Sequence, residues 1–261
     1  AYNRTPCIQT DTIEMLLMWS MRFVEAFAGD ITNALHEHLE LWRYSAVLRD
    51  PKFPSPKRRN ANDIRQELID YLDHLRMTGG SLPGRLDSGG TMQIYWTHLV
   101  RLFKTHEAVF RPNQPMRALV EQSGLPISDQ LPLTTPITAT LGEKHWLTGP
   151  FQYGEARHMA RLLRTACFVV IAYLSGMRTG EVLNLQRGCV SHDSVTGLWT
   201  ITGRKFKGAV DDQGNKIPEG QIRDDPWVVV EQSARAVAVL ERLHDHRLLF
   251  PNHVHPQLRH G

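Results

Sequence analysis

A polar turn at residues 175–181, Ser-Gly-Met-Arg-Thr-Gly-Glu, carries the side chains best suited to chemistry in this chain. A long apolar segment precedes it, and Gly176 predicts the end of that helix, since glycine adopts the left-handed conformation that closes many helices. A second helix is expected to begin at Thr179 or just after it, which places Arg178 immediately before a helix N-terminus. Backbone N–H groups and the helix dipole favour a phosphate there, and a guanidinium can bind two phosphate oxygens at once. The alternative is a purely structural corner in which Arg178 forms a salt bridge with Glu181.

This turn and the residues that follow it resemble the first arginine box of the tyrosine recombinase (phage integrase) family. The box reads small-Gly-Leu/Met-Arg-x-Gly/Ser-Glu-aliphatic-x-x-Leu, and every fixed position is filled between Ser175 and Leu185. The family then has a small antiparallel sheet with a lysine in one hairpin, followed by a helix, and the same order is expected here. The resemblance covers roughly residues 155–250, close to the first half of the family's catalytic domain. Residues 11–123 stand where the family carries a helical core-binding domain, and there the similarity is one of architecture alone.

The resemblance implies a site-specific DNA recombinase or integrase that cuts and rejoins double-stranded DNA without metal, ATP or another cofactor. In the family, a tyrosine attacks a DNA phosphate to form a 3′-phosphotyrosine, two arginines hold the non-bridging oxygens, and a hairpin lysine protonates the leaving 5′ oxygen. Carried over to this chain, Arg178 is the first arginine and Glu181 orients it. The lysine is Lys207, beside Gly208 at the mouth of a loop, or Lys205, which alternates with it along a strand. The family also implies a homotetramer on DNA and a cytoplasmic, DNA-associated location.

The second half of the family's site is expected to lie outside this sequence. In the family, a His-x-x-Arg box, a later His or Trp and the nucleophilic tyrosine all follow the first arginine. All six tyrosines of this chain precede Arg178. Residues 255–260 resemble the His-x-x-Arg box only superficially, because the histidine is displaced by one position. We therefore expect the chain to be cut at both ends from a longer protein, to lack the nucleophile, and to be inactive alone.

Composition bounds the class of protein without fixing its function. The chain has 261 residues, of which 41% are hydrophobic, enough for a buried core in one large domain or two modest ones. Its net charge of +3, with a pI near 8.8, is compatible with nucleic acid binding. The cysteines are sparse (Cys7, Cys167 and Cys189), and two of them lie in or beside apolar segments, which indicates buried thiols in a reducing compartment. No apolar run is expected to span a membrane, and the N-terminus is not a signal peptide.

Hydrophobic periodicity predicts a mainly α protein with a small antiparallel sheet, an α+β class. We expect a helical core-binding, DNA-clamping domain at residues 1–125, a proline-rich linker at 126–152, and the N-terminal part of a catalytic domain at 153–261.

Capping residues and apolar spacing place the individual elements. In the first domain helices are expected at 11–28, with Asp11 and Glu14 as a capping box, from Asp30 to near Asp50, from Asn62 to Thr78, and from Thr91 to about Phe110. In the last domain we expect a helix at 154–175, strands at 198–202 and 227–230, and a helix at 233–243.

Basic residues outside the arginine box are candidates for contact with the DNA backbone. The loop at residues 51–60 combines three prolines with Lys57, Arg58, Arg59 and a further lysine, and it could equally be a plain solvated loop. Lys104 on the fourth expected helix and Arg204 in the hairpin complete this set.

Two other functions compete with a recombinase. His244 and His246, then His253 and His255, form two His-x-His pairs that could bind zinc together with His260, although no cysteine or carboxylate pattern accompanies them. The other alternative is a non-catalytic DNA-binding relative with the same fold. The helix after Thr179 offers few polar side chains for reading base edges, which disfavours groove recognition by that helix.

Overall fold

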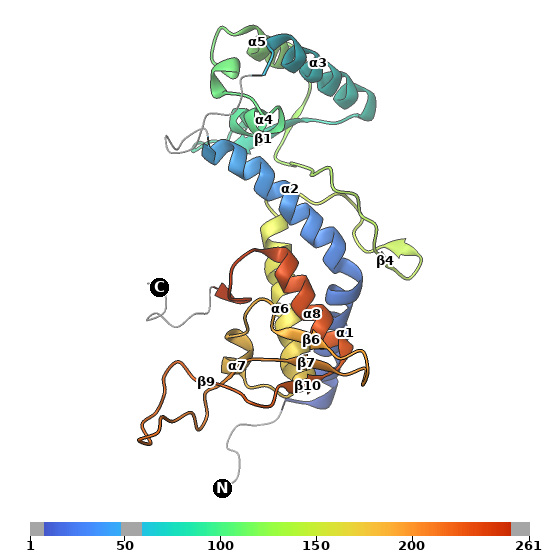
Figure 1. Cartoon of the computed structure of the whole chain (residues 1–261). Helices are drawn as coiled ribbons and strands as arrows, with labels where there is room; N and C mark the ends of the chain where they lie inside the picture. Colours follow the sequence, from blue (N-terminus) through green and yellow to red (C-terminus); the bar gives the residue numbers. More distant parts are fainter. Residues whose placement is uncertain (1–7, 48–58, 252–261) are drawn as a thin grey trace. The chain divides into compact units, whose positions relative to one another are not determined.

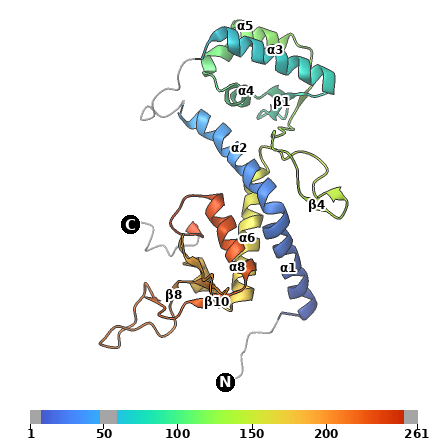
Figure 2. The same ribbon diagram turned by 45° about the vertical axis from the view of Figure 1, so that its right-hand side comes forward.

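The computed structural model of the chain describes residues 8–47 and 59–251 (Figures 1 and 2). Within those residues it is mainly helical with small sheets, which confirms the expected α+β class. The contacts divide the chain into two compact units. The first unit comprises the described parts of Ala1–Thr32, Ile137–Thr148 and His158–Gly261, and the second comprises those of Asn33–Pro136 and Gly149–Arg157.

The boundaries of these units differ from the expected domain boundaries, which were 1–125, 126–152 and 153–261. The N-terminal helical residues belong to the unit that holds the arginine box, because the π-helical turn η1 (Phe23–Phe27) contacts the helix α8 (Glu231–Leu243). Residues of the expected linker belong partly to one unit and partly to the other.

One continuous helical run replaces the first two expected helices. It consists of α1 (Thr10–Arg22), η1 and α2 (Ala28–Val47). The prediction that Asp30 caps a new helix is wrong, because buried apolar residues such as Phe27 and Ile31 continue on one face across that point. The predicted capping box of Asp11 and Glu14 is also wrong: Gln9 is the N-cap, and no side chain caps this end.

Asp30 instead accepts hydrogen bonds from a segment that is distant in the sequence. Its carboxylate is buried and accepts hydrogen bonds from the backbone N–H groups of Thr138 and Ala139, both at 3.0 Å, and from the Thr138 hydroxyl at 2.6 Å. The indole N–H of Trp146 donates a fourth bond at 2.9 Å, and its ring stacks on Phe27. Burial opposes ionisation of Asp30, yet these hydrogen bonds outweigh it and lower the carboxyl pKa. Residues 138–146 are therefore held by a specific anchor.

In the second unit, α3 (Ala61–Thr78) supplies one face of a compact apolar core. Its cap is Asn60, whose side chain accepts from the N–H of Asn62, so the predicted cap at Asn62 is displaced by two residues. The predicted single helix from Thr91 to Phe110 is wrong; a strand, a short helix and a 3-10 turn replace it. The remaining elements are β1 (Leu82–Leu86), β2 (Met92–Ile94), α4 (Trp96–Leu102), η2 (Glu107–Phe110), α5 (Pro115–Glu121) and β3 (Ile127–Ser128). Strand β1 pairs antiparallel with β2 and parallel with β3.

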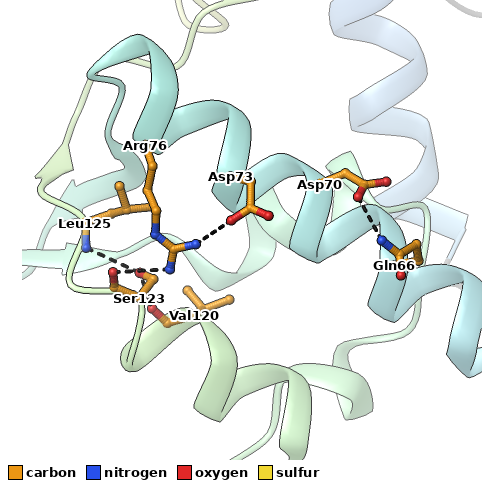
Figure 3. Close-up of polar contacts among 7 residues, drawn as sticks. All are labelled: Gln66, Asp70, Asp73, Arg76, Val120, Ser123 and Leu125. Carbon is orange, nitrogen blue, oxygen red and sulfur yellow. Dashed lines mark hydrogen bonds and ion pairs between the residues drawn. The ribbon is translucent and has the colours of Figure 1, made fainter.

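Polar contacts tie the end of α3 to the chain after α5 (Figure 3). Arg76 forms an ion pair with Asp73 at 2.6 Å and also reaches the carbonyl of Ser123 at 3.4 Å. The Ser123 hydroxyl in turn donates to the carbonyl of Val120 at 2.7 Å, which closes the C-terminal end of α5. Because the ion pair is exposed, its contribution to stability is small, about 0.5 kcal/mol, and the apolar core below carries most of the packing energy.

A second carboxylate on α2 anchors the start of the expected linker. Glu37 accepts from the N–H and the hydroxyl of both Thr134 and Thr135, at 2.6 to 2.8 Å. Burial again works against ionisation, and the hydrogen bonds nevertheless lower the pKa of Glu37. The segment also contains the short hairpin of β4 (Thr140–Leu141) and β5 (Lys144–His145).

The first unit contains the elements that position the arginine box. Helix α6 (Ala156–Ser175) and helix α8 run alongside each other in both views (Figures 1 and 2). An antiparallel sheet has the order β10-β7-β6, and a separate two-stranded ribbon pairs β8 with β9. The predicted helices at 154–175 and 233–243 and the predicted strands at 198–202 and 227–230 are confirmed within a few residues. The bounds of the shorter elements are α7 (Thr179–Leu183), β6 (Val190–His192), β7 (Trp199–Ile201), β8 (Arg204–Lys205), β9 (Gln221–Ile222) and β10 (Trp227–Val229).

Helix α6 corrects one expectation drawn from composition. It is the one helix among the described residues that could cross a membrane by length and composition, where the sequence was expected to contain none. The core helix of a soluble protein passes the same test, and Cys167, Val170 and Ile171 on this helix are fully buried. Cys167 and Cys189 are buried free thiols as predicted, and burial raises the pKa of Cys189 to about 12. Cys7 lies outside the described residues.

Candidate active site

The turn between α6 and α7 has the geometry that the sequence predicts. Helix α6 ends at Ser175, and Gly176 adopts φ +65°, a left-handed conformation that side chains other than glycine rarely take. Met177 is buried and fixes the turn to the core, and its N–H donates to the Ser175 hydroxyl at 3.2 Å. Arg178 is the N-cap residue of α7, with extended backbone. The predicted position of Arg178 just before a helix N-terminus is confirmed.

A buried carboxylate holds this arginine in place. Glu181 is 3% exposed, and its two oxygens accept from different groups of Arg178: the backbone N–H at 2.7 Å and the guanidinium at 3.1 Å. The side chain of Arg178 itself is 63% exposed. The salt bridge considered as a structural alternative therefore exists, but it leaves most of the guanidinium facing solvent. A fixed, exposed guanidinium is suited to bind an anion from solution.

Arg178 lines a cavity of about 330 Å³ in the first unit. The cavity gathers all four residues that the sequence assigns to catalysis, together with three others. Its lining consists of Gly176, Arg178, Glu181, Lys205, Lys207, Arg223 and Trp227. These residues come from the turn, from the β8–β9 ribbon and from β10, so segments up to about fifty positions apart in the chain meet at one site.

The two candidate lysines reach the cavity from different local structures. Lys205 is half-buried on β8, opposite Gln221 of β9. The prediction that Lys207 continues the same strand is wrong, because β8 ends at Lys205 and Lys207 lies in a turn before Gly208, whose φ is +76°. Lys207 is exposed and nevertheless lines the same cavity. The structure brings both lysines to the site.

Two lining residues, Arg223 and Trp227, were missed by sequence reasoning. The Arg223 guanidinium lies 4.7 Å from the centre of the Trp227 ring, and its backbone N–H donates to the carbonyl of Gly203 at 3.0 Å. Gly203 allows this approach: a Cβ there would lie 3.2 Å from the Trp227 ring and 3.3 Å from Leu185. The available signal was an arginine on the returning arm of the hairpin that carries the candidate lysines.

The cavity is therefore strongly cationic. Four cationic side chains and one carboxylate line it, and the carboxylate already binds Arg178. Such clustering of cations costs free energy unless an anion binds among them, because like charges repel more strongly where water is partly excluded. Phosphate is the anion that two guanidinium forks and two ammonium groups fit best. The site can hold a phosphate and stabilise extra negative charge on its oxygens.

The residues expected to contact the DNA backbone are only partly accessible for that role. Lys57 and Arg58 lie outside the described residues. Arg59 forms an ion pair with Glu67 and donates to the carbonyl of Phe103 at 2.9 Å, which turns its guanidinium toward its own unit. Lys104 is exposed, with a positive φ of 44°.

Arg204 is half-buried and donates to the carbonyl of Gly220 at 2.9 Å. It lines a second cavity of about 240 Å³ rather than the one around Arg178. Arg187 and Arg247 also line that second cavity.

The histidines show no metal geometry within the described residues. No group of three potential ligands lies close enough together there to hold a metal ion. The His244 ring contacts the carbonyl of Leu249 at 3.1 Å, and burial, the largest cause, lowers the pKa of this histidine. His253, His255 and His260 lie outside the described residues.

No model of a known protein family matches the chain, and no curated protein matches it. The activity of the cavity therefore has to be inferred from the chemistry of its own residues.

Proposed function

We propose that this chain belongs to a site-specific DNA recombinase or integrase that cuts and rejoins double-stranded DNA through a 3′-phosphotyrosine. One observation carries the proposal. The arginine, the carboxylate and both candidate lysines named by the sequence pattern line a single cationic cavity, although they are separated by up to 29 positions in the chain. A structural arginine corner gives no reason for the hairpin lysines to meet it there.

In the proposed reaction, a tyrosine hydroxyl loses its proton to solvent and its oxygen forms a bond to phosphorus. The bond from phosphorus to the 5′ oxygen breaks, and that oxygen takes a proton from Lys207 or Lys205. Arg178, held by Glu181, binds the non-bridging oxygens as their negative charge grows. Preorganised donors of this kind lower such barriers by about 3 kcal/mol each. The free energy of the broken bond is kept in the phosphotyrosine, so rejoining needs no ATP.

In the proposal, the nucleophilic tyrosine, the second arginine and a further histidine or tryptophan of the family are not supplied by this chain, whose six tyrosines all precede Arg178. The partners are double-stranded DNA and other copies of the protein, assembled as a tetramer on DNA. The proposed location is the cytoplasm, in association with DNA.

A nicked suicide substrate tests this function in the full-length protein. The nick lets the strand segment beyond the cut diffuse away, so that a covalent protein–DNA adduct accumulates and is seen on a denaturing gel. An adduct that forms with a chelator present and without ATP supports the proposal. Absence of an adduct from a folded protein that binds the duplex would overturn it.

Replacing Lys207 with alanine is expected to slow adduct formation about 10²-fold, and replacing Lys205 about 10-fold. The reason is that Lys207 is exposed in the turn at the cavity and free to approach a leaving oxygen, whereas Lys205 is half-buried on β8. The rates are measured in single-turnover reactions.

A substrate with sulfur in place of the 5′ oxygen shows which of the two lysines is the general acid. A thiolate leaves without a proton, so the defect of the variant that lost the general acid is expected to disappear on this substrate. Recovery of the Lys205→Ala variant but not of Lys207→Ala would move the general acid to Lys205.

A non-catalytic DNA-binding relative of the same fold is the second candidate, and the cationic lining of the cavity suits it as well, because binding a backbone phosphate needs no nucleophile. It predicts salt-sensitive binding of duplex DNA by the full-length protein with no adduct. In that case the cavity would bind a backbone phosphate without cleaving next to it.

A further inference from the structure

We propose that Arg223 is a further catalytic residue, which binds the same phosphate as Arg178 from the hairpin side of the cavity. This inference rests on the proposed function and adds a guanidinium to the two arginines that the family resemblance implies; the described part of the chain supplies it. Three independent observations support it: the fixed position of Arg223, its lack of an acidic partner, and the side of the ribbon from which it projects.

The position of Arg223 is fixed before any ligand binds. Its guanidinium lies over the face of Trp227, 4.7 Å from the ring centre, and Trp227 is only 9% exposed. Its backbone is held by the bond from its N–H to the carbonyl of Gly203. A guanidinium stacked on a ring keeps its N–H edge available for anions, because the stacking uses the flat face and the hydrogen bonds lie in the plane.

Arg223 also has no acidic partner to satisfy it. Within residues 8–47 and 59–251, no carboxylate lies at ion-pair distance from its guanidinium. Other arginines of the same unit do have such partners, for example Arg235 with Glu231 at 2.9 Å. A half-buried arginine that faces two lysines and another arginine is a binding group for an anion from outside the chain.

The pairing of the ribbon explains why Arg223 and Lys205 reach the same cavity. Arg204 pairs with Ile222, and both of these residues line the second cavity. Side chains alternate between the two faces of a strand, so the neighbours of this pair, Lys205 and Arg223, project from the opposite face. Both line the cavity around Arg178. The ribbon thus directs Lys205 and Arg223 to the phosphate site and Arg204 away from it.

A further arginine beside Arg178 on the phosphate has a clear chemical use. The transition state of phosphoryl transfer carries charge on all the equatorial oxygens, and one guanidinium fork covers two of them at most. Arg178 reaches the phosphate from the α6–α7 turn and Arg223 from the ribbon, so together they can bind oxygens on different sides.

Single-turnover adduct formation by the full-length protein tests this role. Arg223→Ala is expected to slow the reaction about 10²-fold, because one preorganised donor to the transition state is lost. Its dissociation constant for the duplex should change by less than about 5-fold, since one phosphate contact among many is removed. Arg223→Lys should recover only part of the rate, because an ammonium group lacks the planar fork. Arg235→Ala, which removes an exposed arginine of the same unit, is the matched control and should react like the unchanged protein.

A neutral phosphate at the cleavage position distinguishes contact from a structural role. With a methylphosphonate there, less negative charge has to be stabilised, and the Arg223→Ala defect is expected to shrink to about 3-fold or less. An equal defect on both substrates would overturn the proposal, because it would mean that Arg223 only supports the fold or a neighbouring phosphate. Normal reaction of Arg223→Ala, alongside a large defect in Arg178→Ala, would also overturn it while leaving the recombinase intact. Absence of any adduct from the unchanged protein would instead contradict the proposed function.

Discussion

Replacing Arg178 with alanine is expected to lower the rate of adduct formation about 10³-fold, while the dissociation constant for duplex DNA changes less than about 10-fold. The large effect on rate follows from the position of this side chain, which is 63% exposed, lines the cavity and is aligned by a buried carboxylate. The small effect on binding follows because a duplex contacts a protein through many phosphates. Single-turnover reactions measure the rate of adduct formation, and titrations at one salt concentration measure the dissociation constant for duplex DNA.

This substitution also leaves the local fold intact, which makes the result interpretable. Glu181 accepts from the backbone N–H of residue 178, and alanine keeps that group. The cap of α7 therefore survives, and only the bond from the guanidinium to Glu181 is lost. Circular dichroism should match that of the unchanged protein, and the thermal midpoint should fall slightly, because the buried Glu181 carboxylate loses its ion-pair partner. Retained cleavage by a folded Arg178→Ala variant would contradict the proposed recombinase function.

The sequence predicts the turn around Arg178 from local pattern, and the two candidate lysines from the family resemblance. Gly176, Arg178 and Glu181 lie within six positions, and the turn, cap and carboxylate contact follow from helix-end chemistry alone. Arg223 and Trp227 could not be found in the same way. Arg223 and Trp227 reach the cavity of Arg178 through the pairing of β8 with β9 and the course of a long hairpin loop. Residue spacing predicts neither of these.

The fold shows the same division between local and long-range information. Helices α6 and α8 were predicted because their apolar faces repeat with helical period over many residues. The run from Thr10 to Val47 was divided wrongly at Asp30, since an aspartate after a glycine has the appearance of a helix cap. Its partners Thr138 and Trp146 lie more than a hundred positions away, so no local pattern could reveal them.

Replacing Asp30 with alanine is expected to lower the free energy of unfolding of the first unit by about 4 kcal/mol at pH 7. The carboxylate accepts four hydrogen bonds, and its removal leaves the N–H groups of Thr138 and Ala139 and the Trp146 indole without that acceptor. Unpaired donors near a packed interior are the costly part of such a loss. Urea unfolding measures the change, and hydrogen exchange of residues 137–148 should show faster exchange at Thr138 and Ala139. Glu25→Ala, an exposed carboxylate on the same helical run, is the matched control.

The pH dependence gives this prediction its sharpest test. Because the folded protein lowers the Asp30 pKa below its ordinary value of 3.8, ionised Asp30 stabilises the fold fully above that value, and the contribution is lost as the pH falls through the folded pKa. The difference in unfolding free energy between the unchanged protein and Asp30→Asn should therefore be largest near neutral pH and shrink in acid. A difference that stays constant from pH 7 down to the folded pKa would mean that Asp30 acts through its shape rather than its charge. The hydrogen bonds to residues 138–146 would then hold the segment without any contribution from the ionisation of Asp30.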